Sequence, residues 1–190
     1  MLSAPTGRPL RADASRNRQA IIVAAREAFA EDGVGSSLDG IAIRAGVGNA
    51  TLYRNFPTRE DLLVAVMQEG IESAASNGRE LRVKLPAREA MAEWLFRLAW
   101  HLRTWHDLPS KVVASMGDPA SPLQEACAPL RLVTSNLFED ARDARAVVDT
   151  VTPDEVFELV TILSWGLDRY GDDPETARKR LSLATAGIFA

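Results

Sequence analysis

The sequence lacks most of the features that mark secreted and membrane proteins. A single cysteine, Cys127, excludes an intramolecular disulfide. No apolar run approaches the ~18 residues that a membrane-spanning helix needs, and residues 1–18 have no apolar core of the kind found in a secretory signal. We therefore expect a reducing, cytoplasmic setting and no membrane partner.

Patterns that carry catalysis, or that hold a metal, cofactor or phosphate group, are also missing. CxxC and HExxH do not occur, so no metal ligand and no cofactor is predicted. Gly46 and Gly48 lie between two helical patterns, without the strand and lysine of a phosphate-binding loop. Cys127 has no histidine nearby, and His101 and His106 adjoin no carboxylate cluster. A buried thiol and two ordinary histidines are the favoured interpretation, and no catalytic residue or enzyme activity is expected.

Charge is unevenly divided along the 190 residues, whose length suits one large domain or two small ones. The net charge is -4, yet residues 1–60 carry eight arginines against six acidic residues. This balance permits a DNA-facing N-terminal end without establishing one. Residues 1–14, with Arg8 and Arg11, are expected to form a flexible basic arm, either a solvated tail or a segment that contacts phosphates or the minor groove.

Apolar residues recur at helical spacing throughout the chain, and no alternating strand pattern is found, so the sequence predicts an all-α fold. Pro129 is expected to kink or split one long helix. Residues 76–86 break the periodicity and are expected to mark a boundary. The predicted helices cover residues 15–32, 38–45, 49–56, 58–75, 86–105, 121–143, 153–170 and 174–189, and residues 108–117 form a short helix or an irregular segment.

The most informative stretch is residues 36–63, where two short helical patterns flank a tight break. Ser36 is expected to cap the first helix together with Asp39. Gly46 ends that helix, since glycine readily adopts the left-handed conformation that closes one. The second pattern, residues 49–56, has an apolar side and a polar side. A helix, a glycine turn and a second helix form the helix-turn-helix unit, whose second helix enters the DNA major groove.

The sequence of this stretch resembles the DNA-binding domain of the tetracycline-repressor (TetR) family. The resemblance is strongest in Ala45-Gly46-Val47, Thr51-Leu52-Tyr53 and Phe56-Pro57. The resemblance implies an N-terminal three-helix unit followed by a larger helical ligand-binding and dimerisation domain, about nine helices in total. We accordingly expect a DNA-binding domain at residues 15–57 and a second domain at residues 58–190, with residues 58–75 as a linking helix.

The resemblance also implies which residues contact DNA. Arg54 is an additional donor, able to read guanine or to bind phosphate. Gly48 and Asn55 depart from the family pattern, which often has serine and histidine there. The positions that the family uses for base and phosphate contacts fall on Asn49, Ala50, Thr51, Tyr53, Asn55 and Arg59.

An aromatic stripe in the second domain allows two interpretations. Trp94, Leu98, His101 and Trp105 recur on one helix face. Such a stripe is usually plain core, but it also suits an apolar pocket with a few polar anchors. Met116 and Trp165 are candidates for the far side of such a pocket, and the resemblance favours a pocket in this domain.

The resemblance therefore implies a transcriptional repressor that binds double-stranded operator DNA as a homodimer and is released by a small-molecule effector. Residues 153–170 and 174–189 are the expected dimer helices. Two alternatives stay open: a constitutive DNA-binding dimer without an effector, and a ligand-binding or enzymatic helical protein with a vestigial DNA unit.

Overall fold

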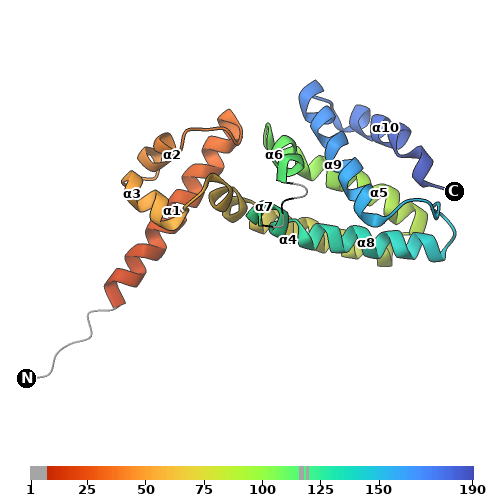
Figure 1. The fold of residues 1–190 in the computed structure, drawn as a ribbon, viewed down its shortest axis with the longest axis horizontal. Coiled ribbons are helices and arrows are strands. Elements are labelled where there is room, and N and C mark those ends of the chain that lie inside the picture. Colours follow the sequence, from red (N-terminus) through yellow and green to blue (C-terminus); the bar gives the residue numbers. More distant parts are fainter. Residues whose placement is uncertain (1–7, 116–117, 119) are drawn as a thin grey trace, which may run out of the picture. The chain divides into compact units, whose positions relative to one another are not determined.

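A computed structural model describes residues 8–115, 118 and 120–190, and Figure 1 shows that this part of the chain is built from helices. The expected all-α class is confirmed: the described residues form ten α-helices and one short 3₁₀ helix, with no strand. None of these helices combines the length and the apolar content that crossing a membrane requires. The α-helices are α1 (Arg8–Asp32), α2 (Leu38–Arg44), α3 (Asn49–Asn55), α4 (Arg59–Lys84), α5 (Ala87–Leu102), α6 (Leu108–Ser115), α7 (Pro122–Ala126), α8 (Ala128–Asp143), α9 (Pro153–Tyr170) and α10 (Pro174–Ala184), followed by the 3₁₀ helix η1 (Ala186–Ile188).

The chain divides into two compact units, one reaching to Val66 and the other beginning at Met67. The boundary falls inside α4, after the division that the sequence places between residues 57 and 58. In the first unit, α1 packs against both α2 and α3, and α2 packs against α3. The shared core is apolar, and its most deeply buried members are Ile21, Ala25, Phe29, Val34, Ile41, Ala42, Leu52, Phe56 and Leu62.

Local signals fix the ends of the short helices in this unit. Gly33 and Gly46 adopt positive φ angles of 79° and 67°, as expected for glycines that close α1 and α2. The expected capping role of Ser36 is wrong, because Ser37 accepts the N–H of Gly40 instead. Ser36 is buried, and its hydroxyl donates to the carbonyl oxygens of Ala28 and Gly33. It therefore fastens the loop to α1.

In the second unit, α5 is the central helix and packs against α8, α9 and α10 (Figure 1). One broad side of α5 is buried because all three neighbours cover it. Helix α6 packs against α7 and α9. The buried residues of α5 are Ala90, Met91, Trp94, Leu95, Leu98, Ala99 and Leu102.

Two helices are longer than the sequence pattern suggests. Helix α1 begins at Arg8 and not at residue 15, so residues 8–14 of the expected arm are helical, and residues 1–7 lie outside the described part. Pro9 falls in the first turn, where a missing N–H costs little. Helix α4 continues to Lys84 through the expected boundary at residues 76–86, because Leu81 extends its buried stripe.

The expected break near Pro129 is confirmed as a split: α7 ends at Ala126 and α8 begins at Ala128, with Cys127 between them. Thr152 and Glu155 form the reciprocal cap that begins α9. The last helix is shorter than predicted. It ends at Ala184, and the chain continues as the 3₁₀ turn.

Candidate functional site

Helix α3 has a buried side and an outward side, as its sequence pattern predicts. Leu52 and the following Phe56 are each 1% exposed and anchor the helix to the core of the first unit. The guanidinium of Arg18, from α1, lies 4.8 Å from the centre of the Phe56 ring. Of the residues expected to contact DNA, Asn49, Ala50, Tyr53 and Arg54 are exposed, and Thr51, Asn55 and Arg59 are half-buried.

Hydrogen bonds already engage part of this outward side. Arg54 donates from Nη2 to Thr51 Oγ1 at 3.1 Å, and Asn55 donates from Nδ2 to the Thr51 carbonyl at 2.8 Å. Asn49 donates from Nδ2 to Asp39 Oδ1 on α2 at 2.8 Å. Arg54 keeps most of its donors for a partner, whereas the amide of Asn55 stabilises its own helix.

Arg59, at the start of α4, contacts the loop between α1 and α2. Its Nη1 donates to the carbonyl oxygens of Ser36 at 2.6 Å and Val34 at 3.1 Å. The Nη1 group of Arg59 is therefore used to hold the unit together. Arg44, which the sequence pattern did not single out, pairs through Nη2 with Glu31 on α1 at 2.7 Å. This hydrogen bond lowers the pKa of Glu31 and raises that of Arg44.

The six residues expected to line one pocket are not gathered around one cavity in the described part of the chain. Trp94 is 1% exposed, and its Nε1 donates to Thr134 Oγ1 at 2.9 Å. Leu98 is fully buried in the core, and Trp105 is half-buried after α5. Met116 lies outside the described residues. Trp165 is 48% exposed and lines a shallow groove with Ser110, Val113 and Ile162.

His101 lines a cavity of about 330 Å³ between α4 and α5, and an edge of Trp94 also reaches it. This cavity lies on the α4 side of α5, whereas the sequence suggested the helices that follow. Burial lowers the pKa of His101, so its imidazole is neutral near pH 7. A neutral imidazole offers a ligand one donor and one acceptor. The cavity lining also includes Gly70, Ser73, Ala74, Asn77, Phe96, Arg97, Trp100 and Thr104.

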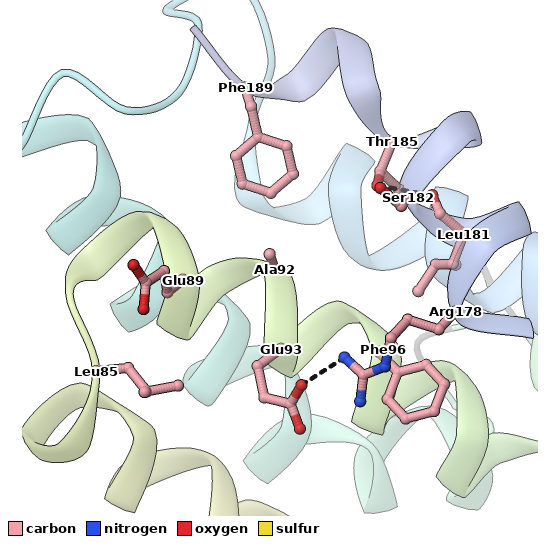
Figure 2. A pocket seen from close by; sticks show the side chains of 10 residues that line it. All are labelled: Leu85, Glu89, Ala92, Glu93, Phe96, Arg178, Leu181, Ser182, Thr185 and Phe189. Atoms are coloured by element: carbon pink, nitrogen blue, oxygen red, sulfur yellow. Dashed lines mark hydrogen bonds and ion pairs between the residues drawn. The ribbon is translucent and has the colours of Figure 1, made fainter. Parts of the chain in front are cut away.

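A larger cavity of about 420 Å³ lies between α5, α10 and Phe189 (Figure 2). Glu93 receives hydrogen bonds from Arg178 at 2.6 Å and from Arg97 at 2.7 Å. Burial by itself would raise the pKa of Glu93, but these two arginines together outweigh it, and the pKa falls. Arg178 also lies 3.8 Å from the centre of the Phe96 ring. Sequence reasoning missed this site, because only the i, i+4 spacing of Glu93 and Arg97 is a local signal.

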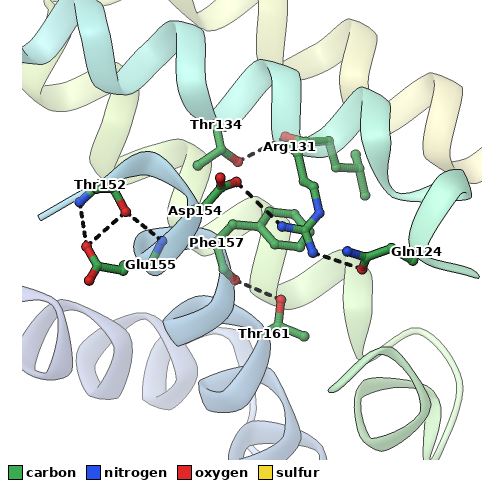
Figure 3. A network of polar contacts seen from close by, with 9 residues as sticks. Gln124, Arg131, Thr134, Thr152, Asp154, Glu155, Phe157 and Thr161 are labelled. Carbon is green, nitrogen blue, oxygen red and sulfur yellow. Dashed lines mark hydrogen bonds and ion pairs between the residues drawn. The ribbon is translucent and has the colours of Figure 1, made fainter. Parts of the chain in front are cut away.

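A third polar centre joins α7, α8 and α9 (Figure 3). Arg131 donates to Gln124 Oε1 at 3.0 Å and lies 3.5 Å from an oxygen of Asp154. Its guanidinium stacks 4.5 Å from the centre of the Phe157 ring. Burial raises the pKa of the neighbouring Cys127 thiol to about 11, although Arg131 opposes the shift. The thiol is therefore protonated near neutral pH, which makes it a poor nucleophile.

One group of side chains has the composition of a metal site. Ligand atoms of His106, Asp107 and Asp168 lie within 4.8 Å of one another. His106 Nδ1 is 3.2 Å from Asp168 Oδ2, and the same oxygen accepts the backbone N–H of Asp107 at 3.2 Å. Asp168 therefore already has partners within the group, and His106 and Asp107 are exposed to solvent. Asp168 is distant from the other two in sequence, so spacing could not have revealed the group.

Two family models match the chain, one to each unit. Residues 21–66 match a model described as bacterial regulatory proteins of the tetR family. Residues 86–190 match the C-terminal domain described as transcriptional regulator SbtR-like. An HTH-type transcriptional regulator from Staphylococcus aureus is 35% identical over 74 residues, which are 38% of this chain and 40% of the relative. The alignment thus spans less than half of that relative's length.

Solved structures resemble the chain over nearly its whole length. A TetR transcriptional regulator from Streptomyces coelicolor is 29% identical, with a TM-score of 0.55, and the match covers 90% of this chain and 98% of the other. FadR from Bacillus subtilis, solved in complex with stearoyl-CoA, has a TM-score of 0.64 at 20% identity, with the same 90% and 98% coverage. The second match, at such low identity, supports the fold alone.

Proposed function

This chain belongs to the TetR family of bacterial transcriptional regulators, and we propose that it represses transcription by binding a palindromic operator as a homodimer and leaving it when a small effector binds. The outward side of α3 carries the proposal. Asn49, Tyr53 and Arg54 are exposed on a helix that Leu52 and Phe56 hold firmly from behind. Such a helix can enter the major groove without unfolding its own unit.

A dimer is needed because the seven residues of α3 reach few bases. Two copies whose recognition helices lie about 34 Å apart would read successive major grooves of one operator. The apolar residues at helical spacing within residues 174–189 do not supply the interface, because Ala177, Leu181 and Ile188 are buried within the chain itself and Ala184 is exposed. The outer surface of α9 and α10 is the better candidate.

Both helices expose large apolar side chains. Ile162 and Trp165 on α9 are 52% and 48% exposed, and Leu183 on α10 is 79% exposed. A side chain added at Gly166, on α9, would meet no atom within 4 Å, so another helix can approach closely there. We propose that α9 and α10 of two copies pack together across this surface, which would bury an apolar patch that a monomer leaves in water.

The dimer is tested by Ile162→Glu, which places a charge at the centre of the proposed interface. Leu132→Glu is the matched control, since Leu132 is 62% exposed on a different helix, α8. Sedimentation should give a dimer for the wild type and the control and a monomer for Ile162→Glu. A wild-type monomer at micromolar concentration would refute the dimer.

For the effector we propose the cavity between α4 and α5. Its neutral His101 and its aromatic residues suit an uncharged or weakly charged, partly aromatic molecule. FadR from Bacillus subtilis binds stearoyl-CoA in its crystal structure, which supports a small-molecule effector in this fold. Helix α4 runs without a break from Arg59 to the cavity residues and on to Lys84. A ligand that displaces α4 would therefore also displace Arg59, which contacts the loop before α2.

The energy required for release is small. An effector that favours the DNA-incompetent state by about 1–3 kcal/mol loosens the operator roughly 5- to 150-fold, and DNA must weaken effector binding by the same factor. The site is tested with Ala74→Leu, which adds bulk to the cavity wall, and Ser76→Leu, an exposed control on the same helix. Once thermal-shift screening has identified a ligand, Ala74→Leu should bind it more weakly and Ser76→Leu should not. Equal ligand binding by the two variants would show that the ligand binds at another site.

The function as a whole is tested by gel shift on the DNA that flanks the protein's own coding region, with and without that ligand. Retarded DNA that the ligand releases is the expected result. Retarded DNA that no ligand releases would favour a constitutive DNA-binding dimer. Ligand binding without any retarded DNA would favour a ligand-binding protein with a vestigial DNA unit.

A further inference from the structure

An acidic side chain lies beside the first residue of the proposed recognition helix. Asp39 on α2 accepts a hydrogen bond from Asn49 Nδ2 on α3, with Oδ1 and Nδ2 2.8 Å apart. Both side chains are exposed, and no described basic side chain forms an ion pair with Asp39. A carboxylate on a DNA-binding surface repels phosphate and by itself weakens binding, so we ask what else Asp39 contributes.

The chemistry of the pair fixes the orientation of the Asn49 amide. An ionised carboxylate only accepts hydrogen bonds, so Asp39 must face the NH₂ group of Asn49 and not its oxygen. One N–H of Asn49 is thereby used. Its carbonyl oxygen and its second N–H are left for a partner, which means that Asn49 presents one acceptor and one donor.

That pair of groups matches one base edge better than the others. In the major groove adenine offers the N6 amino donor and the N7 acceptor, whereas guanine offers only acceptors, at N7 and O6. A phosphate also offers only acceptors, and the Asp39 carboxylate disfavours its approach by like-charge repulsion. Thymine and cytosine each match only one of the two free groups of Asn49.

We propose that Asp39 is a positioning residue for specificity: it holds Asn49 so that Asn49 reads an adenine, and it keeps that amide from binding phosphate or guanine. The proposal rests on the proposed function, since it requires α3 to enter the major groove. Asp39 acts through Asn49 and need not contact DNA itself. Its removal should therefore affect discrimination at one operator position and leave the other positions unchanged.

The change in affinity for nonspecific DNA distinguishes this positioning role from a merely structural one. Losing Asp39 removes a negative charge from the DNA-facing surface, so affinity for nonspecific DNA should rise slightly. A substitution that damaged the fold would lower affinity for every sequence. Asp32→Asn is the matched control for charge, because Asp32 is an exposed acidic residue of the same unit that does not contact Asn49.

The experiment uses the full chain and an operator selected from a pool of random duplexes. Each A·T pair of that operator is replaced in turn by G·C, and affinities are measured for the wild type, Asp39→Ala, Asp39→Asn, Asn49→Ala and Asp32→Asn. In the wild type, one position in each half-site should show a roughly 5- to 150-fold preference for adenine that Asn49→Ala abolishes.

Asp39→Ala and Asp39→Asn should lose most of that preference at the same position only, and Asp32→Asn should keep it. The double variant Asp39→Ala/Asn49→Ala should lose no more there than Asn49→Ala alone, because both residues act in one contact. Wild-type discrimination in both Asp39 variants, or an equal loss at every position, would overturn the inference and leave the proposed function standing. Failure of the wild type to select any sequence would overturn both.

Discussion

Helix α3 and helix α5 both carry polar or aromatic side chains at helical spacing, but their surroundings differ. On α3, Tyr53 is 47% exposed, because Leu52 and the following Phe56 turn the opposite side of that helix into the core of its unit. On α5, Trp94 is 1% exposed, because it is hydrogen-bonded to Thr134 on α8 and packs beside Gly78 on α4. The comparison teaches that periodicity defines the faces of a helix, whereas the neighbouring helices decide which face remains for a partner.

The largest effect that follows from this contrast is on stability. Trp94→Ala should lower the free energy of unfolding by about 3–5 kcal/mol, because it removes a large buried side chain and leaves Thr134 without its donor. Urea unfolding followed by circular dichroism measures the change. Trp100→Ala is the matched control, being half-buried on the same helix, and should lose clearly less. Equal losses of unfolding free energy in the two variants would show that Trp94 is no more firmly packed than Trp100.

Gly78 on α4 gives a second test of how tightly the aromatic face of α5 is packed. A Cβ at this position would lie 2.5 Å from Trp94 Cζ3 and 2.6 Å from Val133 Cγ1. Gly78→Ala should therefore destabilise the protein by about 1–3 kcal/mol through overpacking, despite the ~1 kcal/mol that alanine gains in helix propensity. Thermal or urea unfolding provides the measurement.

The control for this overpacking is Gly40→Ala on α2, where the nearest atom to the added Cβ is 3.6 Å away. This variant should be slightly stabilised. If Gly78→Ala were stabilised as well, the contact between α4 and α5 would be looser than described.

On α3, substitutions should weaken DNA binding and leave stability nearly unchanged. Arg54→Ala and Tyr53→Ala should leave the free energy of unfolding within about 0.5 kcal/mol of the wild type, because neither side chain is part of the core. Operator binding should weaken, by about 1–3 kcal/mol for Arg54→Ala if that residue reads a base. If Arg54 contacts only phosphate, the loss should be the same on all sequences, with a shallower salt dependence. Unchanged operator affinity in both variants would show that these α3 residues do not contact DNA.

The smallest effect concerns pH and the cavity between α4 and α5. Burial lowers the pKa of His101 in the folded chain, so the unfolded chain binds a proton there more readily. This contribution to stability is complete above about pH 6.5, the unperturbed value, and is lost as pH falls through the lowered pKa. His101→Gln should flatten that part of the stability profile. Identical profiles for the wild type and His101→Gln would contradict the burial of this group.

Local signals in the sequence were enough to predict the helix-turn-helix unit and most helix ends. Thr152 with Glu155, and Ser121 with Pro122, mark the starts of α9 and α7 within a few residues, and the structure uses both as caps. Ser36 was misassigned because Ser37 is an equally good cap, and only the packing of the loop against α1 decides between the two residues.

The features that were missed depend on contacts between distant residues. Helix α4 continues past Gly78 because Leu81 extends its buried stripe, and the ring of Trp94 occupies the space beside that glycine. The Asp39–Asn49 pair forms across the angle between two helices, and the pair of Glu93 with Arg178 joins α5 to α10. No spacing rule contains these distances, because they result from how the helices cross.

Selection of binding sites from random duplex DNA by the full chain tests the central claim most directly. If the outward side of α3 reads bases and the protein is a dimer, the selected sequences should contain two inverted half-sites whose centres lie about 10 base pairs, or a multiple of that, apart. Tyr53→Ala/Arg54→Ala should fail to enrich them. Enrichment of a single half-site without symmetry, or of no sequence at all, would contradict the account.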